Sequence, residues 1–158
     1  MPNTSPAAAT QPRFIKVSDT GLLLPSTAAE WSGVYIPAIE LTVARRILPI
    51  RGDFTLANKA CAEQDLCGAK AVRSVDAREF FNHLQDFDRY GPCLDPEFFT
   101  IDDPWQWIWT STECAPRGYA VAVYLYVGNV CRLRQSNLCS ALPCRPGQIT
   151  GSLVPEAA

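Results

Sequence analysis

The sequence lacks the long apolar run that a membrane span requires. None of its hydrophobic stretches approaches the roughly 18 to 20 residues needed to cross a bilayer. Residues 1–10 also lack the basic and apolar segments of a secretory signal peptide. We therefore expect a chain without a membrane span, made in the cytoplasm and either retained there or incorporated into a larger particle.

An excess of either charge is missing as well. The chain has 14 Lys and Arg residues and 16 Asp and Glu residues, so its net charge is −2. This balance gives no general attraction to nucleic acid or to an anionic membrane surface. Nucleic acid is therefore not an expected partner.

Histidine is almost absent, and this limits both metal binding and catalysis. His83 is the only histidine, and no two cysteines have the Cys-x-x-Cys spacing of a structural zinc site. A cysteine nucleophile needs a nearby base, but His83 falls on the polar side of a predicted helix with no cysteine motif around it. We therefore predict no metal, no cofactor and no enzymatic activity.

The seven cysteines allow two interpretations. In a secreted protein they would form up to three disulfides and leave one thiol. In a reducing cytosol they would be small buried hydrophobic residues. The missing signal peptide favours the second interpretation.

Acidic residues accumulate in one segment, where their oxygens are of the kind that binds calcium. The alternative is that they are solvated loop residues or turn formers before proline, and we favour that interpretation. The residues are Asp86, Asp88, Asp95, Glu97, Asp102 and Asp103.

The composition is that of one folded domain. Hydrophobic residues make up 47% and charged residues 19% of 158 residues, enough to bury a core without metal support. Such a weakly charged surface is typical of a protein that is partly covered by a partner. We predict a flexible arm over 1–12, a domain over 13–146 and a tail over 147–158.

In the first half, residues 14–17 predict a strand, and residues 33–43 predict one irregular or edge strand because Pro37 interrupts it. Residues 55–66 predict a helix that Gly68 stops. Its expected apolar positions are Leu56, Ala60 and Cys61.

A second helix is predicted from Asp76, because Glu79 follows three residues later as in a capping box. Its aromatic and aliphatic stripe, expected in the core, consists of Phe80, Phe81, Leu84 and Phe87. A long connection over 88–106 precedes a β-rich end. There, residues 119–127 predict a strand apolar on both faces, which is either buried on both sides or presents its aromatic face to a partner. A two-residue turn at 128–129 and strands over 130–135 and 142–145 are predicted to follow.

The order of these motifs resembles C-type-lectin-like domains, in particular the family at the C-termini of bacterial collagen-like adhesins and in many phage and prophage proteins. The Trp-Thr-Ser-Thr segment at 109–112 is the most characteristic part, and the similarity covers roughly 14 to 145. The other matching positions are Phe14, Gly21, Trp31, Val34, Ala57, Ala60, Cys61, Gly68, Arg73, Glu79, Pro92, Asp95, Phe98, Phe99, Gly128 to Val130, and Arg145. Two motifs of the family's first half are missing, at 36–43 and 72–75, and so are the calcium motifs of sugar-binding lectins.

The resemblance implies an α+β, C-type-lectin-like fold, in which two helices pack on short antiparallel sheets with long irregular loops. It also implies two disulfides to consider, Cys61–Cys144 and Cys131–Cys139. Such domains usually bind a ligand. The resemblance therefore favours a non-enzymatic phage or prophage virion component, associated with the tail or tail fibre. Its partner would be a particle protein or a host-surface ligand used in attachment, and a homo-oligomer is compatible with this role.

Aromatic and polar residues near the C-terminal hairpin form the expected binding surface, because aromatic and arginine side chains are typical of interface hot spots. This surface comprises Tyr124, Tyr126, Arg132, Arg134, Gln135, Ser136 and Asn137. Trp105, Trp107 and Trp109 add aromatic area, and we expect Trp109 to lie in the core.

Two other functions stay open. One is a small intracellular phage-encoded inhibitor that binds and blocks a host defence protein, which predicts reduced cysteines and a single host partner. The other is a catalytic lectin-like fold, which would need a bound metal or a reactive thiol.

Overall fold

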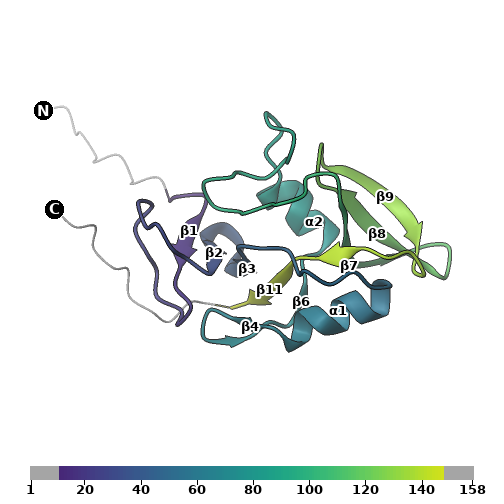
Figure 1. The fold of residues 1–158 in the computed structure, drawn as a ribbon, viewed down its shortest axis with the longest axis horizontal. Coiled ribbons are helices and arrows are strands. Elements are labelled where there is room, and N and C mark those ends of the chain that lie inside the picture. Colours follow the sequence, from purple (N-terminus) through teal and green to yellow (C-terminus); the bar gives the residue numbers. More distant parts are fainter. Residues whose placement is uncertain (1–10, 148–158) are drawn as a thin grey trace, which may run out of the picture.

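A computed structural model describes residues 11–147 and shows a mixed α+β chain, as predicted (Figure 1). Two short helices accompany two main sheets in this part of the chain. One sheet lies at the left of Figure 1 and the other at the right, with α1 below them. The predicted arm (1–12) and tail (147–158) fall almost entirely outside the described residues.

The first sheet joins the beginning of the chain to its end. Its strand order is β1 (Ile15–Val17), β2 (Gly33–Ile36), β3 (Leu41–Ala44), β11 (Pro143–Pro146) and β6 (Arg73–Ser74), and all pairs are antiparallel. The final strand therefore lies between two strands from the first half of the chain.

The segment predicted as an irregular or edge strand over 33–43 is interrupted at Pro37, as predicted, but it forms two strands and neither lies at an edge. Pro37 begins a short 3₁₀ helix, Pro37–Ile39, and Glu40 adopts a left-handed conformation with φ of 49°. The chain consequently turns back, and β2 pairs with β3. Both strands lie inside the sheet, because proline fixes the turn and leaves the apolar residues on either side free to pair.

The second sheet has the order β10 (Ser140–Ala141), β7 (Trp107–Cys114), β8 (Tyr119–Tyr124) and β9 (Asn129–Arg134). As predicted, β8 is buried on both faces, from Ala120 to Val123. The predicted two-residue turn was wrong, since residues 125–128 separate β8 from β9. Leu125 is drawn into the core instead of extending the strand.

Helix α1 (Phe54–Glu63) begins at Asp53, whose carboxylate accepts a hydrogen bond from the backbone N–H of Leu56 at 2.8 Å. Its buried face consists of Phe54, Ala57 and Cys61, whereas Leu56 is 53% exposed, contrary to the prediction. The helix also ends earlier than predicted. Gly68 belongs to the turn between β4 (Asp65–Leu66) and β5 (Ala69–Lys70), with φ of +91°.

Helix α2 (Ala77–Glu79) begins with the predicted capping box and continues as a π-helical turn, Phe80–Leu84. Phe80 and Leu84 are completely buried. Phe81 is 49% and Phe87 67% exposed, so the prediction of a four-residue core stripe was wrong for these two. The π-helical turn is wider than an α-helical turn, so the apolar residues no longer follow a 3.6-residue spacing. The turn ends with the hydrogen bond from Gln85 N–H to the Phe80 carbonyl, and Phe87 therefore lies beyond the helix.

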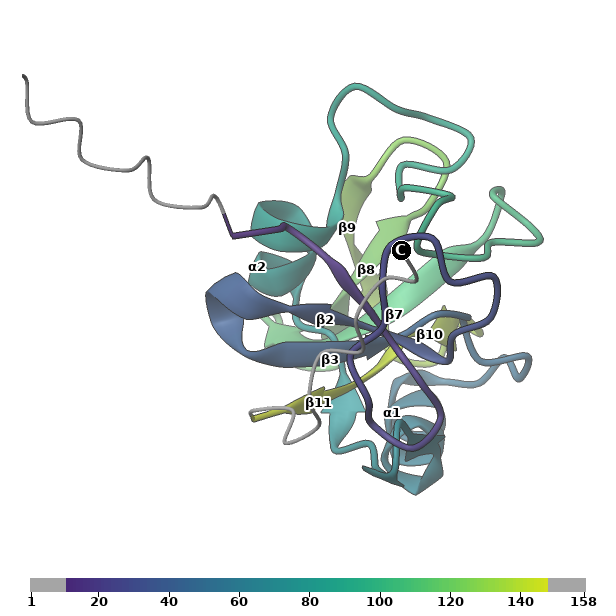
Figure 2. The same ribbon diagram turned by 90° about the vertical axis from the view of Figure 1, so that its left-hand side faces the viewer.

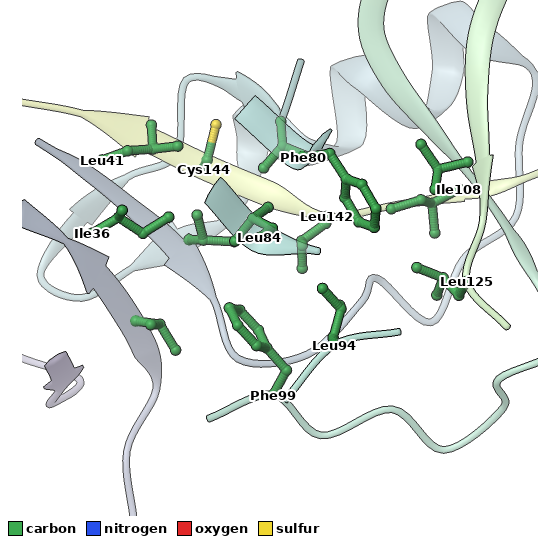
Figure 3. Packing of buried hydrophobic residues seen from close by; sticks show 14 of the residues in the cluster. Ile36, Leu41, Phe80, Leu84, Leu94, Phe99, Ile108, Leu125, Leu142 and Cys144 are labelled. Carbon is green, nitrogen blue, oxygen red and sulfur yellow. The ribbon is translucent and has the colours of Figure 1, made fainter. Parts of the chain in front are cut away.

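The main core lies where the first sheet, α2 and the β7–β8 pair meet (Figure 3). Figure 3 shows Phe80 and Leu84 facing Phe99, Leu94, Ile108 and Leu125, with Leu142 between them. A second cluster lies under α1, where Phe54 and Cys61 pack against Trp109 and Ala122. The two clusters cover opposite faces of the second sheet.

An ion pair fixes the start of α2 to β6. Arg73 donates two hydrogen bonds to Glu79, from Nη1 to Oε1 at 2.6 Å and from Nη2 to Oε2 at 2.8 Å. Glu79 also accepts from the backbone N–H of Asp76 at 2.9 Å. Burial opposes ionisation of Glu79, but the hydrogen bonds from Arg73 and Asp76 outweigh it, so its pKa is lowered.

Glu79→Gln is expected to cost about 2 kcal/mol of unfolding free energy at neutral pH, because it removes a charge-assisted pair that is partly buried. The folded carboxyl has the lower pKa. Its contribution is therefore complete above the unfolded pKa of about 4.3 and is lost as the pH falls through the folded value. Urea unfolding at several pH values below neutral should show the wild type converging on the variant in acid. A constant difference down to acidic pH would contradict this account.

Candidate functional site: an aromatic surface

Several aromatic rings gather at one end of the second sheet. Trp105 stacks on Tyr126 with ring centroids 4.2 Å apart, and Trp107 stacks on Tyr124 at 5.0 Å. Tyr126 joins these pairs, because its ring lies 6.2 Å from Tyr124 and 5.9 Å from Tyr90. We call Tyr90, Trp105, Trp107, Tyr124 and Tyr126 the aromatic surface.

Strand geometry explains why the rings meet. Trp107 and Tyr124 are directly paired in the β7–β8 ladder, so their side chains lie on the same face. Ala120 and Ala122 precede Tyr124 on this face and pack in the cluster under Phe54 of α1. Beyond the part of this face that α1 covers, large aromatic rings occupy the positions instead of small alanine side chains.

Backbone hydrogen bonds attach the long connection to this end of the sheet. Gly91 N–H donates to the Tyr126 carbonyl and Cys93 N–H to the Leu125 carbonyl, both at 2.8 Å. On the other side, Leu125 N–H donates to the Gln106 carbonyl at 3.1 Å. In Figure 2 this connection between α2 and β7, in teal and green, extends above the strands. The loop is therefore fixed to the hairpin, and the rings it carries are held in place.

Gly91 is needed for the position of Tyr90. Its φ is +63°, in the region that glycine adopts most easily, and a Cβ at this position would lie 3.2 Å from the Tyr126 ring. A side chain at residue 91 would therefore strain the backbone and crowd the Tyr126 ring. This close approach brings the neighbouring Tyr90 beside the other rings.

The outer rings of the aromatic surface are open to solvent. Tyr90 is 73% and Trp105 63% exposed, whereas Trp107, Tyr124 and Tyr126 are half-buried beneath them. A ring that is held in place but uncovered can contribute its apolar area to binding with little loss of conformational entropy. Tyr90 was not among the binding residues expected from the sequence, and its only local signal is the Tyr-Gly-Pro turn in which it stands.

The structure places the binding residues expected from the sequence on two separate surfaces. Tyr124 and Tyr126 belong to the aromatic surface. Arg132 is paired with Val121 in the ladder, and Tyr124 with Asn129, so Arg132 and Tyr124 lie on opposite faces of the hairpin. Arg134 shares the face of Arg132.

The polar turn of the predicted surface lies at the other end of β9. Tyr119 pairs with Arg134 at that end, five positions from the Tyr124 pair, or about 16 Å along the strand. Gln135 donates to the Tyr119 carbonyl at 3.1 Å, and Asn137 to the Arg134 carbonyl at 3.0 Å. Arg132 donates to the Ala115 carbonyl at 3.2 Å, and Ser136 is exposed in the same turn. These residues thus form a separate surface, away from the rings.

The cysteines of the described segment are free thiols. Neither bridge implied by the resemblance, Cys61–Cys144 or Cys131–Cys139, is formed in this structure. Burial raises the pKa of Cys61 and of Cys144 to about 12, which keeps both protonated and unreactive at neutral pH. Cys131 is exposed on β9.

A groove of about 690 Å³ lies between residues 44–51 and 100–106. Its lining mixes charges of both signs, including Arg45, Arg46 and Asp102, with Arg46 3.7 Å from Asp102. Trp31 offers no free ring face there, because Lys16 Nζ lies 3.9 Å and the Arg45 guanidinium 3.7 Å from its centroid. The groove therefore favours no single class of ligand.

Within residues 11–147, no three His, Cys, Asp or Glu side chains are placed to hold a metal ion together. Nor does this part of the chain contain a helix of the length and apolar character that a membrane crossing would require.

No protein-family model, curated protein or solved structure matches this chain. The aromatic surface and its surroundings are therefore the basis for any statement about function.

Proposed function

We propose that this chain is a non-enzymatic binding domain whose aromatic surface docks on another protein. The observation that carries the proposal is the exposure of Tyr90 and Trp105 on a rigid support of stacked rings. Tryptophan and tyrosine are the residues most enriched among interface hot spots, and large exposed aromatic groups are costly for a chain that has no partner.

The finer fold belongs to the same proposal, namely a C-type-lectin-like arrangement. Three features support it. The final strand β11 pairs with β3 from the first half, two helices pack against the sheets, and a long connection precedes the β7–β9 sheet. The Trp-Thr-Ser-Thr segment lies in β7, and Trp109 is fully buried there as expected.

The setting that we propose is a phage or prophage particle, in which the chain would be a tail or tail-fibre component. The support is the ordered set of family-like residues in the sequence, together with an uncovered surface suited to assembly. In that setting the partner is a particle protein or a host-surface protein.

The test is affinity capture of the tagged full chain from its source cells during phage production, with co-purifying proteins quantified by mass spectrometry. We expect tail or baseplate proteins in fixed stoichiometry. The double variant Tyr90→Ala/Trp105→Ala should reduce their recovery about tenfold, the loss typical of removing interface hot spots. Leu56→Ala, a change at an exposed apolar residue on α1, is the matched control and should leave recovery unchanged.

The alternatives give different results. A single host protein with no particle proteins would replace the virion proposal with the intracellular inhibitor. Equal recovery by wild type and double variant would remove the aromatic surface as the binding site, whatever proteins are captured.

A further inference from the structure

The connection that carries the outer rings also has a marked excess of negative charge. Residues 85–106 contain six carboxylates and one basic residue, Arg89, which gives this segment a charge of −5. The net charge of the whole chain is −2, so the remainder is net positive, at +3. The acidic residues are Asp86, Asp88, Asp95, Glu97, Asp102 and Asp103.

Carboxylates lie close in sequence to both exposed rings. Asp88 precedes Tyr90 by two residues, and Asp103 precedes Trp105 by two, and both carboxylates are exposed. Asp103 also accepts a hydrogen bond from the backbone N–H of Trp105 at 3.0 Å. Each outer ring is thus held within a few residues of an exposed negative charge.

The nearby cations are already engaged by carboxylates. Arg89 Nε lies 3.4 Å from Asp86 Oδ2, and Arg46 lies 3.7 Å from Asp102. Asp88 and Asp103 have no ion pair of this kind among the described residues. The border of the aromatic surface therefore keeps an excess of negative charge.

Aromatic faces and carboxylates attract the same kind of group. A guanidinium or ammonium ion is stabilised over the electron-rich face of tryptophan or tyrosine, and it also pairs with carboxylates. Phosphate-bearing ligands such as nucleic acid are disfavoured by the same border, because like charges repel. The surface is thus complementary to an apolar, positively charged polypeptide.

Resting on the binding function proposed above, we infer that the partner of the aromatic surface is a basic protein segment that presents arginine or lysine side chains to Tyr90 and Trp105. The cationic heads lie over the outer rings and next to Asp88 and Asp103. The aliphatic stems of these side chains cover the apolar area around the rings. Part of the attraction is electrostatic and is weakened by salt.

The probe is a library of random peptides, selected on the immobilised full chain and sequenced before and after selection. We expect Arg and Lys to be enriched in the selected peptides. Individual peptides should bind the Tyr90→Ala/Trp105→Ala variant about tenfold more weakly, as is typical of hot-spot removal.

A second variant, Asp88→Asn/Asp103→Asn, tests the charge alone. Asparagine keeps an oxygen that can accept the Trp105 N–H, so the ring stays in place while both charges are removed. We expect this variant to bind the basic peptides several-fold more weakly and to lose most of their salt dependence. Glu113→Gln, at an exposed carboxylate near the far end of β7, is the matched control and should bind normally.

The outcomes distinguish failure of the basic-partner proposal from failure of the proposed binding surface. Selected peptides that need Tyr90 and Trp105 but contain no excess of Arg and Lys would overturn the basic partner and leave the binding surface standing. Peptides that bind the double aromatic variant as well as the wild type, or no enrichment at all, would overturn both.

Discussion

Trp109→Ala is expected to lower the unfolding free energy by about 3 to 5 kcal/mol, the range measured when large aromatic residues are removed from cores. Trp109 is completely buried in β7 and packs edge-on against Phe54 of α1, with ring centroids 5.5 Å apart. Its indole N–H donates to the Gly52 carbonyl at 3.1 Å, just before that helix begins. The substitution therefore opens a cavity and also removes one of the two hydrogen bonds to this carbonyl, which keeps the bond from the Cys139 backbone N–H at 3.0 Å. Equilibrium urea unfolding followed by circular dichroism measures the loss.

Trp105→Ala is the matched comparison, because the same residue type is removed from the exposed aromatic surface. Its cost should stay within about 1 kcal/mol, the value of one stacked pair with Tyr126. If Trp109→Ala does not fold at all, Trp109→Phe keeps most of the volume and should lose about 1 kcal/mol, the typical net contribution of the one hydrogen bond that it removes. Equal losses for Trp105→Ala and Trp109→Ala would contradict the division between core and binding residues.

The second large effect is a loss of stability in alkali. Burial raises the pKa of Cys61 and Cys144 to about 12 and that of Cys67 and Cys93 to about 11. In the unfolded chain a thiol ionises near pH 8.5. These thiols therefore stay protonated only when folded, and their contribution is complete below about pH 8.5 and lost as the pH rises towards the folded values.

The size of the stability loss follows from the number of thiol protons that are released on unfolding. Each thiol that is ionised only in the unfolded state contributes a slope of about −1.4 kcal/mol per pH unit, so four of them give about −5 kcal/mol per unit near pH 10. That loss is comparable with the entire stability of a small domain. Urea unfolding in the presence of a non-thiol reductant, repeated between neutral pH and pH 10, measures it.

Single cysteine substitutions test whether the buried thiols cause this change of unfolding free energy with pH. Cys93→Ala should reduce it by about 1.4 kcal/mol per pH unit, because one raised pKa is removed. Cys131→Ala, at an exposed cysteine of β9, should leave it unchanged. Stability that stays constant up to pH 10, or equal slopes in both variants, would contradict the burial of these thiols.

Features fixed by neighbouring residues could be predicted from the sequence. The capping box of Asp76 and Glu79 depends only on residues three apart, and it forms as predicted. The apolar faces of β8 follow from a continuous apolar run, which needs little information about distant residues. The mixed α+β architecture agrees with what the resemblance implied.

Features fixed by distant contacts could not be predicted. Phe81 and Phe87 fit a helical stripe, yet the π-helical turn and its end at Leu84 leave both exposed, and only Phe80 and Leu84 enter the core. Leu56 is exposed for a similar reason. The face of α1 that packs on the sheet consists of Phe54, Ala57 and Cys61, and Leu56 lies outside that face.

The candidate site shows the same limit. Tyr124 and Arg132 are close in sequence, but the strand register places them on opposite faces, and register depends on the length of the turn between β8 and β9. Tyr90 joins the site only because backbone bonds to residues 125 and 126 fold the long connection onto the hairpin. No local sequence pattern predicts such a contact between segments far apart in the chain.

Oxidative footprinting of the free chain and of its complex with the captured partner tests the central claim most directly, because hydroxyl radicals label exposed aromatic side chains fastest and exposed leucine side chains as well. We predict that Tyr90 and Trp105 are labelled rapidly in the free chain and are strongly protected in the complex. Leu138, exposed beside the polar turn at the other end of β9, should be labelled equally in both. Protection of Leu138 and its turn, with Tyr90 and Trp105 unchanged, would contradict the aromatic surface as the site of binding.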